Sequence, residues 1–113
     1  MEDCIFCKII KGEIPSKKVF ENENVVAFHD INPEAPIHIL VIPKKHISTH
    51  QDIIKEDGKI LVDMHLAINQ IAKDFGFDEN GYRVITNCKE DGGQLVNHLH
   101  FHILAGKKLG AKL

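Results

Sequence analysis

The chain has 113 residues, 43% of them hydrophobic, with a formal net charge of −2, eight histidines and Arg83 as its one arginine. That length and apolar content suit one packed domain over residues 1–113, without internal repeats or linkers. The longest apolar run covers 39–42, far short of the about 20 residues that span a bilayer, so we expect no membrane partner. The mixture of positive and negative charges argues against a nucleic-acid partner. The acidic start at 1–3 is unlike a secretory signal and three cysteines make no disulfide framework, so we expect a cytoplasmic protein with reduced thiols.

The hydrophobic pattern predicts a short helix, three strands, a long helix and two more strands. The expected elements are a helix over 5–11, a hairpin with strands at 19–20 and 25–28, a strand over 37–42, a helix over 59–75, and strands over 82–86 and 95–104. The strand over 37–42 is nearly all apolar, which is typical of burial on both faces. The long helix has apolar residues every three or four positions, and Gly76 follows it as a left-handed cap. This order predicts an α+β fold with an antiparallel five-stranded sheet, one long helix and one short helix.

Three histidines, His98, His100 and His102, alternate with apolar residues near the end of the chain. On a strand they would line one face, which leaves three interpretations. An exposed polar face does not require imidazole, and three histidines in a line converge poorly on one tetrahedral metal ion. Nucleophilic catalysis needs an imidazole whose orientation and tautomer are fixed by neighbours, and the middle histidine has such neighbours. The spacing therefore favours catalysis.

A glycine-containing stretch at 91–94 precedes the three histidines. It is either a simple hairpin turn or a place where backbone N–H groups approach an anion. Because Arg83 is the one arginine, a guanidinium clamp on a phosphate is not expected. Imidazole and backbone N–H groups would have to bind the phosphate instead.

These residues carry a resemblance to the histidine triad (HIT) superfamily, closest to its histidine triad nucleotide-binding (HINT) branch, over about residues 4–106. The segments that carry it are 5–10, 14–15, 27–31, 35–38, 41–47, 91–94 and the triad itself. The resemblance implies a HIT-like fold, a homodimer, and a purine nucleoside monophosphate or phosphoramidate as ligand. It implies a nucleotide hydrolase similar to adenosine 5′-monophosphoramidase, which acts on the α-phosphate of adenosine or guanosine phosphoramidates and needs no cofactor for catalysis.

The resemblance also implies a role for individual residues. His100 would be the nucleophile and form a nucleotidyl-histidine that water cleaves, while His98 and His102 position it and the phosphate, and His38 completes the site. The implied nucleotide-binding residues are Asp30 at the ribose, Asn87, Gly93 and the backbone N–H of Leu95 at the phosphate, and Ile5, Phe6, Ile9, Phe28 and Ile31 around the purine. Without the resemblance, the apolar residues would be interpreted as core and Asp30 as a turn residue.

Two departures from the family pattern concern this same site. Leu95 stands where relatives have a serine whose hydroxyl reaches the phosphate, and residues 107–113 differ from the Trp-Pro-Pro tail that shapes specificity in many HINT proteins. Two alternatives therefore stay open. One is a nucleotide-binding or partner-docking module with vestigial hydrolysis, and the other is a hydrolase of dinucleoside polyphosphates.

A Cys4-x-x-Cys7 pair places two thiols one helical turn apart. A zinc finger is not expected, because the gap from Cys7 to His46 is far longer than the about 12–15 residues of a finger. The resemblance implies instead a structural zinc held by Cys4, Cys7, His46 and His98. Buried reduced thiols and a redox pair are the alternatives.

Overall fold

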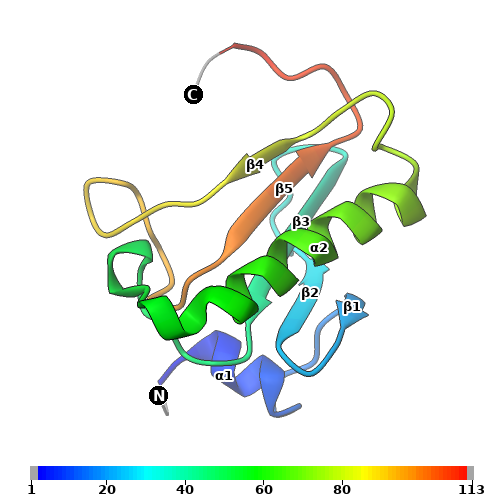
Figure 1. The fold of residues 1–113 in the computed structure, drawn as a ribbon. Coiled ribbons are helices and arrows are strands. Elements are labelled where there is room, and N and C mark those ends of the chain that lie inside the picture. The colour runs from blue at the N-terminus through cyan, green and yellow to red at the C-terminus, as the bar shows by residue number, and fades with distance from the viewer. Residues whose placement is uncertain (1–2, 112–113) are drawn as a thin grey trace.

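The computed structural model describes residues 3–111 of the chain. Its elements are α1 (Ile5–Ile10), β1 (Lys18–Glu21), β2 (Val25–His29), β3 (Ile37–Pro43), two 3₁₀ helices (His50–Asp52 and Lys55–Asp57), α2 (Gly58–Phe75), β4 (Arg83–Ile85) and β5 (Phe101–Ala105) (Figure 1). The predicted α+β fold, with a five-stranded antiparallel sheet, a long helix and a short helix, is confirmed. The 3₁₀ helices were not predicted. None of the helices in residues 3–111 is long and apolar enough to cross a membrane.

The strands lie in the order β1-β2-β3-β5-β4, so β3 is the centre of the sheet. As predicted, β3 is buried on both faces, from His38 to Pro43. One face packs under α2, which Figure 1 shows running across the sheet. The other face packs against α1, whose Phe6 and Ile9 contact residues of β2 and β3. The second face carries the candidate site, and the register that pairs Leu40 with His102 brings β3 and β5 together there.

The helix ends follow from the sequence. Gly76 has φ 77°. Its backbone N–H closes the last turn of α2 by donating to the carbonyls of Ala72 and Lys73. A left-handed residue is the ordinary end of a helix where glycine is available. At the start of α1, Cys4 is the N-cap, and its Sγ accepts a hydrogen bond from the backbone N–H of Cys7. This cap holds the Cys4 thiol close to the first turn of α1.

The predicted strand over 95–104 is wrong at its beginning, because β5 starts only at Phe101. Phe101 pairs with Val41, and the residues before Phe101 leave the pairing although β3 continues to Pro43. The backbone N–H of Leu99 donates instead to the carbonyl of Ile47. The alternation of side chains still holds: Leu99, Phe101 and Ile103 are buried in the core under α2.

Candidate active site

His100 is held in one tautomer by the backbone. Its Nδ1 lies 2.7 Å from the carbonyl oxygen of His98, so Nδ1 carries the proton and donates it to that oxygen. The Nε2 atom therefore keeps its lone pair. The ring is buried, packs edge-on against Phe6 with ring centroids 5.2 Å apart, and lines a large cavity. An imidazole in this state is a prepared nucleophile.

His38 and His102 form a second oriented pair on β3 and β5. The backbone N–H of Glu34 donates to His38 Nδ1 at 3.0 Å, so the proton of a neutral His38 is on Nε2. That Nε2 lies 2.9 Å from His102 Nδ1, to which it donates. By the same reasoning, His102 carries its own proton on Nε2. The Asp30 carboxylate lies 3.4 Å from His38 Nε2 and adds a negative charge beside the pair.

The environment keeps His100 and His102 neutral in the absence of ligand. Burial lowers the pKa of His100. Burial, together with the nearby His100 and His38, lowers the pKa of His102 to about 4, against a smaller opposing effect of Asp30. Burying a cation is costly, and a second imidazolium nearby would repel it. An anion bound at His102 would reverse this balance.

A cavity of about 1030 Å³ opens beside His100 and His102. It has the size of a pocket for a nucleotide-sized ligand. Its lining includes Asp30, Leu95 and every residue predicted for the purine: Ile5, Phe6, Ile9, Phe28 and Ile31. Leu95 is 94% exposed and Ile31 91% exposed, so both stand at the open side of the cavity.

Other lining residues were missed by the sequence reasoning. They are Ile14, Pro15, Ser16, Lys17, His29, Asn32, Leu40 and Val96. Ile14 and Pro15 lie in a segment that carries the family resemblance, which was a signal that could have assigned them. The Ser16 hydroxyl oxygen is buried without a hydrogen-bond partner among the described residues, and no sequence pattern indicates that.

The structure does not bring Asn87 or Gly93 into the lining of this cavity. The Asn87 side-chain amide donates to the carbonyl of Gly92 at 2.7 Å, and the Gly93 N–H donates to the carbonyl of Glu90. Both residues thus stabilise the turn before the triad. Their contact with a phosphate stays a prediction.

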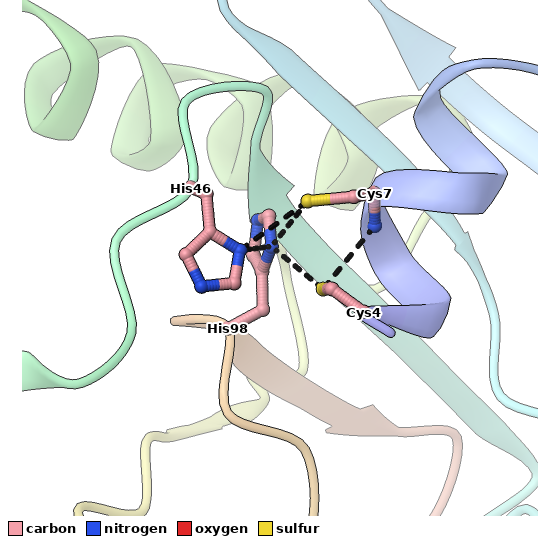
Figure 2. Close-up of side chains that lie close together, drawn as sticks. All are labelled: Cys4, Cys7, His46 and His98. Atoms are coloured by element: carbon pink, nitrogen blue, oxygen red, sulfur yellow. Dashed lines mark hydrogen bonds between the residues drawn. The ribbon is translucent and has the colours of Figure 1, made fainter. Parts of the chain in front are cut away.

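Cys4, Cys7 and His46 form a cluster with His98, the first histidine of the triad, and Figure 2 shows the four side chains close together. Cys4 Sγ is 3.3 Å from His98 Nδ1, and Cys7 Sγ is 3.3 Å from His46 Nδ1 and 3.6 Å from His98 Nδ1. The two Nδ1 atoms are 3.2 Å apart. A zinc ion with tetrahedral bonds of about 2.0–2.3 Å has ligands about 3.3–3.8 Å from one another. These four separations match such a site, and all four donor atoms lie within 4.8 Å of one another, so the residues present fit a zinc ion.

The hydrogen bonds of the two rings are compatible with a cation at this point. His98 Nε2 donates to the carbonyl of Pro43 at 2.8 Å, which leaves the Nδ1 of a neutral ring without a proton. His46 Nε2 lies 3.2 Å from the Ser48 hydroxyl, which can donate to Nε2 or accept from it, so both tautomers of His46 satisfy this contact. Burial lowers the pKa of His46 and, with the nearby His46 and His100, lowers the pKa of His98 to about 4. The contact between the two Nδ1 atoms is satisfied either by a cation between them or by a hydrogen bond from His46 Nδ1–H to His98 Nδ1.

Comparison with known proteins gives consistent results. A family model described as HIT domain matches residues 11–109. A histidine triad protein from Clostridium difficile is 57% identical with a TM-score of 0.96, over 100% of this chain and 98% of that one. A HIT family hydrolase from Legionella pneumophila is 44% identical with a TM-score of 0.94, over 96% and 97%. A histidine triad nucleotide-binding protein from Candida albicans is 36% identical with a TM-score of 0.82, over 98% and 85%.

Proposed function

Because the chain belongs to the HIT family, whose solved members include a hydrolase of the same fold, we propose that it hydrolyses purine nucleoside 5′-phosphoramidates at the α-phosphorus. The observation that carries this proposal is the state of His100. Its Nδ1–H is bonded to the His98 carbonyl, so the Nε2 lone pair is free at the end of a nucleotide-sized cavity. The nucleotide-binding protein among the structural relatives supports the same ligand class.

The proposed binding mode follows from the lining of the cavity. The purine lies between the apolar side chains of α1 and β2, where Phe6 and Phe28 pack edge-on with ring centroids 5.7 Å apart. A flat apolar base suits such a slot. Asp30 accepts hydrogen bonds from the ribose hydroxyls, which places the α-phosphate toward His100 and His102.

In the first half-reaction, the His100 Nε2 lone pair attacks the α-phosphorus. An Nε2–P bond forms, the P–N bond to the leaving group breaks, and the departing amine takes the Nε2 proton of His102. His102 enters this step as imidazolium, because the phosphate anion beside it offsets the burial that otherwise keeps it neutral. In that state His102 Nδ1 carries a proton, so the Nε2–H of His38 donates instead to the Asp30 carboxylate, 3.4 Å away, whose charge adds to the effect.

In the second half-reaction, water attacks the phosphorus of the nucleotidyl-histidine. His102 Nε2 takes a proton from this water, the Nε2–P bond breaks, and its electron pair returns to His100. The product is the nucleoside monophosphate, and both rings regain their starting protonation. Throughout, the His98 carbonyl holds the Nδ1–H of His100 and stabilises the positive charge of the intermediate.

Steady-state hydrolysis of an adenosine phosphoramidate tests the proposal. We expect His100→Ala to lower kcat/KM at least about 10³-fold, since it removes the nucleophile itself. The matched control is His50→Ala, because His50 is an exposed histidine on the first 3₁₀ helix. A His100→Ala variant as active as the control contradicts the mechanism. If the parent binds the nucleotide tightly without turnover, the alternative of a binding module is correct.

We also propose that Cys4, Cys7, His46 and His98 hold one zinc ion with a structural role, separate from the proton-transfer steps. The donor atoms and their spacing support this assignment. Metal analysis of protein prepared without added metal should give one zinc per chain. Cys4→Ala should lose it, and Cys88→Ala, which alters the cysteine outside the cluster, should keep it.

A further inference from the structure

We propose that Leu95 selects the leaving group, so that the chain prefers phosphoramidates whose amine carries an apolar substituent of several carbons. This inference rests on the proposed function and deepens it, because the nucleotide cavity alone leaves the amine undefined. It arises from the position of one side chain. Leu95 is 94% exposed, lines the nucleotide cavity, and belongs to neither of the two hydrophobic core clusters of residues 3–111.

The backbone on both sides of Leu95 is held in place. The Gln94 side chain donates from Nε2 to the carbonyl of Ser48 at 2.8 Å and to that of Val96 at 2.9 Å. Its Oε1 accepts the N–H of Lys89 at 2.8 Å. Val96 packs against the hydrophobic cluster of α1, β2 and β3. A leucine exposed on a surface is common, but this one is fixed at the mouth of a cavity by its anchored neighbours.

The strand order gives the direction in which the ligand lies. The proposed purine slot is at Phe6 of α1 and Phe28 of β2, and Asp30 directly follows β2. His102 lies on β5, which is two strands from β2 in the order β1-β2-β3-β5-β4. A nucleotide bound in this way runs from β2 toward β5. The group beyond its α-phosphate then points to the segment that joins β4 to β5 (Figure 1).

The direction of bond cleavage leads to the same place. The His100 ring is buried, so it approaches the phosphorus from the floor of the cavity. Because displacement at phosphorus is in line, the departing amine points away from this ring, toward the open side. Leu95 stands at that side. Within the described part of the chain, only Leu95 and Val96 between residues 86 and 98 line the cavity, so the surface that meets the amine substituent is apolar.

A second cavity gives the substituent room beyond Leu95. It has a volume of about 440 Å³ and shares Ile5, Leu95 and Val96 with the nucleotide cavity. Ile5 is 46% exposed, and these three side chains form an apolar boundary between the two cavities. An alkyl chain that crosses this boundary covers Leu95, whereas a methyl group is too short to do so. Each methylene that is half-buried in this way should favour binding about twofold.

The test compares two substrates, the n-hexylamide and the methylamide of adenosine 5′-monophosphate. The two amines have nearly the same basicity, so their P–N bonds are similarly reactive, and both substrates give the same nucleotidyl-histidine. A difference in kcat/KM therefore measures contacts of the alkyl chain. For the parent we expect kcat/KM for the hexylamide to exceed that for the methylamide at least about tenfold. In Leu95→Ala, which keeps the backbone N–H of residue 95, the ratio should fall below about threefold.

Ile31→Ala is the matched control. Ile31 is 91% exposed and lines the same cavity, but it follows Asp30 on the side proposed for the purine and ribose. This variant should lower kcat/KM for both amides and keep the ratio of the parent. Thermal unfolding and sedimentation of the parent and both variants show whether fold and oligomeric state are retained.

Four results would overturn the inference. Two are a parent that does not distinguish the amides, and a Leu95→Ala variant that keeps the ratio of the parent. The third is an equal fall of the ratio in Ile31→Ala, because the preference would then belong to the cavity as a whole. The fourth is an unchanged ratio with a lower oligomeric state in Leu95→Ala, which would identify a second copy of the chain as the partner of Leu95.

Failure of the proposed function gives a different result. In that case the parent cleaves neither amide. Calorimetry then compares the Kd values of the hexylamide and the methylamide for the parent and for Leu95→Ala. Tighter binding of the hexylamide that disappears in Leu95→Ala would support the contact with Leu95, and equal Kd values for the parent would rule it out.

Discussion

At the scale of single residues, the site depends on where protons lie on buried imidazole rings. His100, His98 and His38 each have one ring nitrogen committed to a backbone group. Because each of these bonds is made to a backbone group, it selects one tautomer of the neutral ring. The sequence could predict which histidines gather, because their spacing puts them on one face. It could not predict which nitrogen is free, because that depends on the backbone group that each ring meets in the fold: a carbonyl at His100 and at His98, and an N–H at His38.

A pH dependence of stability follows from His102. Its pKa is about 4 in the folded chain, and about 6.5 is expected when unfolded. Between these values the unfolded form binds more protons, so stability must fall as the pH falls from 6.5 toward 4. The groups that face His102 are His100, His38 and Asp30.

The free energy of unfolding should fall between pH 7 and pH 5 in both the parent and His102→Asn. After allowance for solvent screening, we expect the fall to be about 1 kcal/mol smaller in His102→Asn. Urea unfolding at both pH values measures this difference. Because the parent and the variant share the Cys4, Cys7, His46 and His98 cluster, its contribution to the pH dependence cancels in the comparison. Equal losses in parent and variant would show that His102 is not the group whose pKa is lowered.

Leu95 allows a prediction about specificity. The side chain is 94% exposed and lines the cavity, so Leu95→Ser should change stability by less than about 0.5 kcal/mol. A hydroxyl there can donate to a phosphate oxygen, and we expect kcat/KM for an adenosine phosphoramidate to rise about tenfold. Ile54→Ser, at an exposed residue away from the cavity lining, is the control for kinetics and thermal unfolding. An unchanged kcat/KM in Leu95→Ser would mean that the backbone N–H alone serves the phosphate.

At the scale of elements, the sequence predicts the bounds of an element well where nearby residues determine both its apolar face and its ends. Residues 58–75 form α2 almost as predicted, because its apolar stripe and the glycine after it are both local. The beginning of β5 was not predictable in this way. The pairing with β3 begins at Val41, and the Leu99 N–H before it bonds to the Ile47 carbonyl instead, so the start of β5 depends on contacts between distant segments. Pro43 itself belongs to β3, although the sequence placed the end of that strand at 42.

The two ends of α2 give a matched prediction on stability. A Cβ at Gly58 meets no atom within 4 Å, and this residue has helical angles, so Gly58→Ala should stabilise the protein by about 0.5–1 kcal/mol. Gly76 has equal space but φ 77°, so Gly76→Ala should destabilise it by about 1 kcal/mol. Urea unfolding of both variants tests this. The same sign for both would show that backbone conformation does not control these ends.

At the scale of the whole molecule, we propose that the chain forms the homodimer that the family resemblance implies, through exposed apolar side chains on α2 and β4. Val62 and Leu66 are both 57% exposed one turn apart on α2, and Val84 is 42% exposed on the edge strand β4. Edge strands and exposed apolar helix faces are common dimer contacts. We expect sedimentation to give a dimer for the parent and a monomer for Leu66→Glu, while Ile54→Glu stays dimeric. A monomeric parent would contradict the proposal.

The central claim is that His100 becomes covalently bonded to the nucleotide. Intact mass spectrometry after brief mixing with an adenosine phosphoramidate measures this directly, and fragmentation locates the modified residue. We predict that the chain gains one nucleoside monophosphoryl group on His100, that the group disappears as nucleoside monophosphate accumulates, and that His100→Ala gains none. Rapid hydrolysis with no adduct at the earliest times, or an adduct that persists in His100→Ala, would contradict the account.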